Sequence, residues 1–152
     1  MPSEPPFALY PIVSDKSPGA KSFFYHSPTH STPFSGAFRD APVLTIRQVS
    51  AVAHETREMG STSFIGLALN LTDAGKETLR EHLKASSSAS LAVAIDGRIY
   101  GSLDAKDIRY VAESRGNLFI MFPNPGESTT QHLVRLLAEK LSSEVEEQRT
   151  GK

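Results

Sequence analysis

Residues 91–102 read LAVAIDGRIYGS, and this stretch decides the fold. A run of apolar residues comes first, the pair Asp96-Gly97 follows, and Arg98 opens a second segment with apolar members. An Asp-Gly pair readily adopts the positive φ angles of a type I′ turn, whose twist matches that of two paired strands. The stretch therefore predicts a tight β-hairpin with Asp96 and Gly97 as its structural turn.

The composition limits the classes of partner. The chain has 152 residues, no cysteine and a formal net charge of −1. This length suits one domain with a real core. The balanced charge creates no field that would steer the chain to nucleic acid, so we expect no nucleic-acid partner. The lack of cysteine excludes disulfides and thiol catalysis and leaves the compartment open.

No apolar run approaches the roughly 18 to 20 residues that span a bilayer. The first residues also lack the basic and apolar regions of a signal peptide. We therefore expect a soluble chain without direct membrane insertion.

Residues 1–42 hold eight of the ten prolines. Proline removes backbone donors and breaks regular patterns, so we expect a mostly irregular Pro-rich arm. Residues 7–13, FALYPIV, are compatible with an edge strand in this arm, because Pro11 need not donate a hydrogen bond there.

Residues 45–60 show the pattern of a short amphipathic helix. Thr45 and Gln48 have the spacing of a capping box, and Gly60 supplies a stop. Residues 63–71, SFIGLALNL, alternate apolar and small or polar residues, which predicts a half-buried strand.

A second helix is expected after residue 72. Thr72 and Asp73 suit its cap, and Leu79 and Leu83 form its apolar stripe. Gly75 costs helix stability, so its place in the first turn indicates close approach to a sheet.

The segments after the hairpin are less uniform. Residues 104–116 fit a strand or a helical turn, and the alternation of apolar with polar side chains favours the strand. Residues 117–123, NLFIMFP, predict a strand that ends in a turn at 124–126. A capping box at Ser128 and Gln131 begins a last helix, whose apolar stripe comprises Leu133, Leu136/Leu137, Leu141 and Val145.

This order favours an α+β fold, a mainly antiparallel sheet with helices packed on one face. We assign residues 43–148 to a single domain, 1–42 to the arm and 149–152 to a frayed tail.

Residues 41–141 resemble the head subdomain of SecD, an extracytoplasmic part of a membrane component of the bacterial protein-export machinery. The resemblance is carried by APVLT at 41–45, ALNLTDAG at 68–75, the hairpin at 91–102 and the closing helix from residue 128. Leu103 replaces the family's usual proline. The resemblance implies an extracytoplasmic domain that binds polypeptide or a partner protein such as a translocation component, with no enzymatic activity.

No catalytic or metal-binding set stands out in the sequence. Asp96 has the residue type of a catalytic carboxylate, but the turn explains it. His26 and His30 are four residues apart without a nearby carboxylate or thiol, so we expect no metal site and no cofactor. Charged residues near the hairpin suggest a polar binding face, for which the candidate binding residues are Arg98, Tyr100, Asp104, Arg109 and Tyr110.

Two functional hypotheses follow. The first is a non-enzymatic domain that binds an extended polypeptide through a sheet edge and the N-terminal arm. The second is a small-ligand-binding or hydrolytic domain with a deep pocket between the arm and the 91–102 hairpin.

Overall fold

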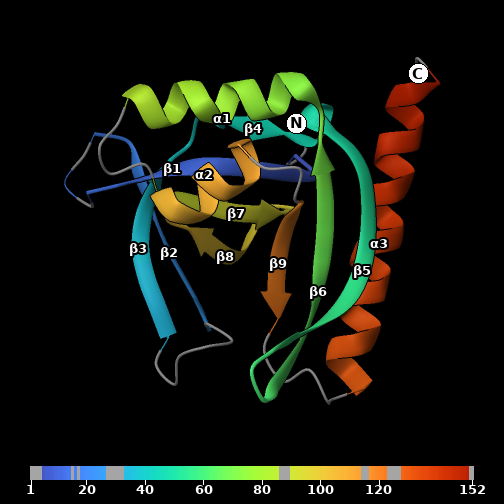
Figure 1. Ribbon diagram of the computed structural model, residues 1–152. Coiled ribbons are helices and arrows are strands. Elements are labelled where there is room, and N and C mark those ends of the chain that lie inside the picture. Colours follow the sequence, from blue (N-terminus) through green and yellow to red (C-terminus); the bar gives the residue numbers. More distant parts are fainter. Residues whose placement is uncertain are drawn as a thin grey trace.

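The computed structural model describes residues 5–14, 16, 18–26, 33–85, 90–113, 117–122 and 128–150. These residues form an α+β fold of two antiparallel sheets with helices packed against them (Figure 1). The larger sheet has the order β2-β3-β1-β7-β8, with β4 paired to β1, and the smaller has the order β5-β6-β9. The predicted fold class is therefore confirmed.

The hairpin predicted at 91–102 is confirmed, and it forms the last two strands at one end of the larger sheet. It comprises β7 (Leu91–Ile95) and β8 (Arg98–Leu103). Asp96 and Gly97 have φ angles of 52° and 80°, as the predicted turn requires. On its other side β7 pairs with β1, so it is an interior strand.

The strand expected over residues 7–13 is present in the arm, but its expected position at a sheet edge is wrong. β1 (Phe7–Val13) pairs with β7 on one side and with β3 and β4 on the other. The backbone N–H of Ile12 donates to the carbonyl of Ser90 at 3.0 Å, so the ladder continues past Pro11 without a proline donor. The described part of the arm is thus mostly strand rather than irregular, with β2 (Ala20–His26) and β3 (Pro33–Arg39) following β1. The short β4 (Leu44–Thr45) comes directly after the arm.

The helix expected over residues 45–60 is also wrong. Its capping box is present, but the helix is a single 3₁₀ turn, η1 (Ile46–Gln48). The chain then enters β5 (Val49–Met59), which pairs along its length with β6 (Thr62–Leu71). A capping box specifies only how a helix starts, and the long ladder with β6 overrides the helical spacing.

The expected strand at 63–71 is β6, but both of its faces are covered. Residues from Phe64 to Leu69, whose side chains alternate between the two faces, are all buried, and β5 and β9 (Leu118–Phe122) pair with β6 on either side. The prediction that this strand is half-buried is therefore wrong.

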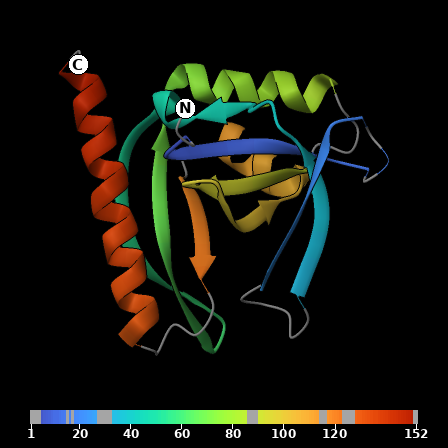
Figure 2. The same cartoon turned by 180° about the vertical axis from the view of Figure 1, so that it is seen from behind.

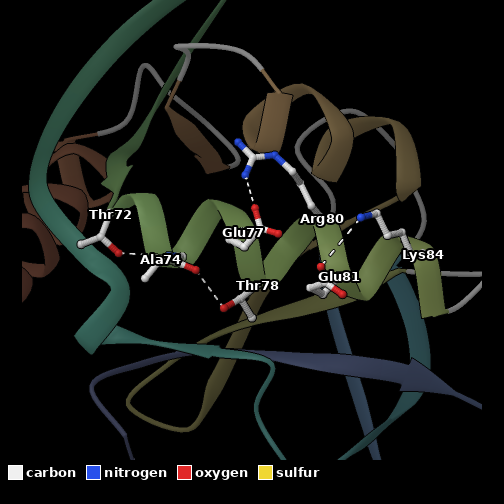
Figure 3. A network of polar contacts seen from close by, with 8 residues as sticks. Thr72, Ala74, Glu77, Thr78, Arg80, Glu81 and Lys84 are labelled. Atoms are coloured by element: carbon white, nitrogen blue, oxygen red, sulfur yellow. Dashed lines mark hydrogen bonds and ion pairs between the residues drawn. The ribbon is translucent and has the colours of Figure 1, made fainter.

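Helix α1 (Asp73–Ala85) confirms the second predicted helix, and Figure 3 shows its polar side. The hydroxyl of Thr72 accepts a hydrogen bond from the backbone N–H of Gly75 at 3.0 Å, which caps the helix. Glu77 and Arg80 form an ion pair at 2.6 Å, and the hydrogen bond from Arg80 lowers the pKa of Glu77.

The other two helices differ in part from prediction. Residues expected as a strand from 104 form α2 (Ala105–Glu113). The last helix is confirmed as α3 (Ser128–Arg149), which extends to a residue that we assigned to the tail. Leu133 and Leu136 are exposed on α3, so they do not belong to its buried stripe, which comprises Val134, Leu137, Ala138, Leu141 and Val145.

Some expectations fall outside the described residues. They are the turn at 124–126, His30 and the side chain of His26.

Replacement of Gly75 tests the close approach that we inferred from its position. A Cβ atom there would lie 2.9 Å from the Cβ of Gln48 and 3.0 Å from its carbonyl oxygen, so the close neighbour is η1 rather than a sheet. Alanine improves helix propensity by about 1 kcal/mol, but overpacking costs about 1–3 kcal/mol. We expect Gly75→Ala to lower the free energy of unfolding, measured by urea denaturation.

Lys84→Ala on the exposed side of α1 is the control, with an expected change within about 0.5 kcal/mol. A Gly75→Ala protein more stable than the parent would contradict the close packing of α1 on η1.

Candidate functional site

The candidate site is the outer edge of β5. Among the described residues, β5 pairs with β6 alone. The two strands are joined by a two-residue turn, with Met59 opposite Thr62 and Gly60 at a φ of 67°. In such a hairpin the closing pair exchanges hydrogen bonds, and alternate residues then direct their backbone N–H and C=O groups outward. The outward residues of β5 are therefore Val52, His54, Thr56 and Glu58.

Helix α3 covers the beginning of this edge. The hydroxyl of Ser142 donates to the carbonyl of Val52 at 3.0 Å, and the side-chain amide of Gln148 donates to the carbonyl of Ile46 at 3.0 Å. Figures 1 and 2 show α3 running alongside β5. The bond from Ser142 independently supports the outward direction of the Val52 carbonyl.

A groove lies between β5 and α3. Its volume is about 550 Å³, and its lining residues are Val52, Ala53, His54, Ala138, Glu139, Ser142, Ser143 and Glu146. Valine and alanine form its apolar part, and two glutamates give it an acidic border. The groove adjoins the part of the edge where the outward residues become exposed.

The outward residues in the second half of β5 are exposed to solvent. His54, Thr56 and Glu58 are exposed, although their partners on β6 include the buried residues Leu67 and Ile65. No hydrogen bond to the backbone groups of these three residues from outside the β5–β6 ladder occurs within the described part of the chain. Within the described ranges, the outward backbone groups of this segment are therefore available to pair with another strand.

On the opposite face of β5, the side chain of Arg57 fixes the position of the strand. Its guanidinium lies 4.1 Å from the ring centroid of Phe119, donates to the side-chain oxygen of Asn117 at 2.5 Å and donates to Glu55 at 2.9 Å. The lack of a side chain at Gly66 leaves room for this arrangement, because a Cβ atom there would lie 3.0 Å from the Phe119 ring. Arg57 thus ties β5 across β6 to β9 and orders the edge.

The structure spreads the predicted binding residues over β8 and α2. Arg98 is exposed at the start of β8, and Arg109 is exposed on α2. The ring of Tyr100 packs 5.2 Å from that of Phe122, so it belongs largely to the core. Tyr110 is 61% exposed on α2. Among the described residues, no ion pair joins either arginine to an acidic side chain.

Asp104 forms a reciprocal cap with Asp107 at the start of α2. Asp104 Oδ1 accepts from the backbone N–H of Asp107 at 2.9 Å, and Asp107 Oδ2 accepts from the backbone N–H of Asp104 at 3.2 Å. The hydrogen bond from the Asp107 backbone lowers the pKa of Asp104, while desolvation raises the pKa of Asp107. This geometry explains both carboxylates as structural caps.

Asp96 also has a structural contact beyond its turn. Its carboxylate forms an ion pair with Lys140 of α3. This ion pair thereby joins the turn between β7 and β8 to α3, the helix that borders the β5 edge.

Apolar side chains from β1, β3 and the 91–102 hairpin pack together on one face of the larger sheet. Tyr10, Ala8 and Ala94 form a small buried cluster, against which Phe38 and Ile99 pack. The rings of Tyr10 and Phe38 are 5.0 Å apart. This packing gives no support to a deep pocket between the arm and the hairpin.

The sequence prediction missed the β5 edge because it assigned these residues to a helix. A usable signal was present in the Gly60-Ser61 pair, which lies between VSAVAHETREM at 49–59 and TSFIGLALNL at 62–71. Such a pair between two strand-forming runs is typical of a tight hairpin.

No family model, curated protein or solved structure matches the chain. In the part of the chain that the structure describes, no cluster of three potential metal-ligating side chains occurs. A helix long and apolar enough to cross a membrane is likewise absent from the described ranges.

Asp104→Ala should destabilise the protein by about 1 kcal/mol near neutral pH, because the start of α2 loses its cap. The pKa of Asp104 is lowered in the folded state, so its contribution is present above the unfolded-state pKa and is lost as the pH falls through the folded-state pKa. Urea denaturation of parent and variant across the acidic range should therefore show a difference that shrinks at low pH.

Arg109→Ala, an exposed change in the same helix, provides the control and should show no such trend. A difference between the parent and Asp104→Ala that does not change with pH would contradict the role of an ionised cap.

Proposed function

We propose that this chain is a non-enzymatic domain that binds an extended polypeptide as an additional strand on β5. The observation that carries the proposal is the exposed edge at His54, Thr56 and Glu58, where backbone groups face outward beside a groove. A peptide that pairs with such an edge gains main-chain hydrogen bonds that do not depend on its sequence. This recognition suits a protein that handles unfolded chains.

The groove supplies a second part of the recognition. Alternate side chains of an added strand point to opposite sides, so those on one side would meet the wall formed by Val52, Ala138 and Ser142. The edge itself is ordered by Arg57 before any peptide arrives. Pre-ordering reduces the entropy cost of binding.

The resemblance of residues 41–141 to the SecD head subdomain supports the same class of function. It adds an extracytoplasmic location and a relation to protein export to the proposal, with a translocation component as the partner protein. The arm adds less to this proposal, because two of its three described strands, β1 and β3, already pair on both sides within the larger sheet. The proposal therefore rests on β5.

Thr56→Pro tests the proposal at one backbone group. The N–H of Thr56 faces away from β6, so proline removes an outward donor and leaves the β5–β6 hydrogen bonds in place. We expect this variant to bind a reduced and alkylated, permanently unfolded protein at least tenfold more weakly than the parent does. Fluorescence anisotropy with the labelled unfolded protein measures the affinity.

Thr56→Val is the matched control, because it keeps the N–H and the β-branched shape and should bind as the parent does. Circular dichroism checks that both variants are folded. Equal affinity of the proline and valine variants, or no binding by the parent, would contradict strand addition at this edge.

A further inference from the structure

We propose that two copies of this chain pair through their β5 edges when no polypeptide is bound. The pairing is antiparallel, with a two-fold axis at Thr56. The inference rests on the proposed function in one respect, since both use the exposed edge of β5. It adds a partner, a second copy of this chain, and a means of regulating the edge.

The sequence of β5 is complementary to itself in this register. Around a two-fold axis at Thr56, Glu55 lies opposite Arg57 of the partner subunit, and His54 lies opposite Glu58 of the partner subunit. Each Thr56 faces its symmetry copy as a hydrogen-bonded pair, because its N–H and C=O point outward. Opposite charges in directly facing positions stabilise an antiparallel pair.

The neighbouring registers are less favourable. A two-fold axis at Glu55, Arg57 or Glu58 would place each of these residues opposite its own copy, so that like charges meet. An axis at His54 would require the carbonyl of Val52, which already accepts from Ser142. The register centred on Thr56 avoids both costs.

The charged groups already have suitable positions in the single chain. Arg57 is held over Phe119 and lies 2.9 Å from Glu55 of the same chain. Two such pairs related by the two-fold axis would form a network of four side chains with alternating charge. Little side-chain order must be gained on pairing, which favours association.

Self-pairing would use the same backbone groups that an added peptide needs. The paired segment is short, from residue 54 to residue 58, so the dimer is a weak and reversible one. A polypeptide therefore competes with the second copy, and the edge is closed only when the protein is concentrated and no polypeptide is available. Closing an exposed edge in this way also protects it from uncontrolled aggregation.

Single cysteine variants test the register, because the chain has no cysteine of its own. The Cα atoms of a hydrogen-bonded pair are about 5.5 Å apart, which a disulfide can bridge. Thr56→Cys should therefore form a disulfide-linked dimer under mild oxidation. In Glu58→Cys the two sulfur-bearing residues would be about 13 Å apart along the paired strands, so this control should remain monomeric on a non-reducing gel.

Charge reversal tests the pairing without a covalent bond. Glu55→Arg and Arg57→Glu each place like charges opposite one another, so each variant alone should dimerise at least tenfold more weakly in sedimentation equilibrium. A mixture of the two restores both opposite-charge pairs and should recover the dimer. Glu81→Arg on α1 is the control and should dimerise as the parent does. Circular dichroism checks the folding of Arg57→Glu, which loses the contact with Phe119.

The outcomes separate this inference from the proposed function. A parent protein that remains monomeric at high concentration, equal crosslinking of the two cysteine variants, or no recovery in the mixture would overturn the self-pairing. Polypeptide binding by the Glu55→Arg variant tests the proposed function separately, because an added peptide does not need that charge. A dimer that forms in the predicted register but never binds polypeptide would support this inference and contradict the function.

Discussion

The pairing of β7 with β1 and β8 is the interaction on which the rest of the structure depends. All residues of β7 are buried, and Leu91 and Ala92 are completely so. Because alternate residues of a strand face opposite sides, Val93 joins the main core, while Ala94 joins the small cluster under β3. One short strand thereby organises both faces of the larger sheet, and the Asp-Gly turn fixes its register.

Local signals in the sequence predicted those parts of the fold that local chemistry decides. The turn at Asp96, the capping box at Thr45 and the cap at Thr72 are all present. The lengths of the elements that follow were predicted less well. The segment after Thr45 becomes a strand because it pairs with β6, and that long-range pairing is not visible in the spacing of its apolar residues.

The segment from residue 104 shows a different kind of error. Ile108, Tyr110 and Ala112 alternate like a strand, but the buried positions are Ile108, Val111 and Ala112, which have helical spacing. Tyr110 belongs to that alternation, but it is exposed on the helix. The acceptor at Asp104 and the carboxylate three residues later formed the more reliable signal, because they describe a helix cap.

The Gly60-Ser61 pair could have indicated the β5–β6 hairpin, but the sequence could not show that β5 is an edge strand beside α3, for a physical reason. The candidate site depends on the contact between Ser142 and Val52, which are 90 residues apart in the chain, and on the path of α3 along β5. The residues predicted near the hairpin instead serve as a cap and a core side chain or lie exposed on β8 and α2. Local patterns identify turns and caps well, but a sheet edge exists only when the whole order of the strands is known.

The charges on β5 restrict how its edge can be used. Charged side chains on an edge strand usually oppose pairing with another strand. Here Glu55 and Arg57 already neutralise each other within one chain, so the edge does not repel an approaching strand as a whole. Repulsion arises only in registers that bring like charges opposite one another. The tight turn at Gly60 determines which backbone groups face outward, and the charge pattern then selects the register in which a second strand can pair with them.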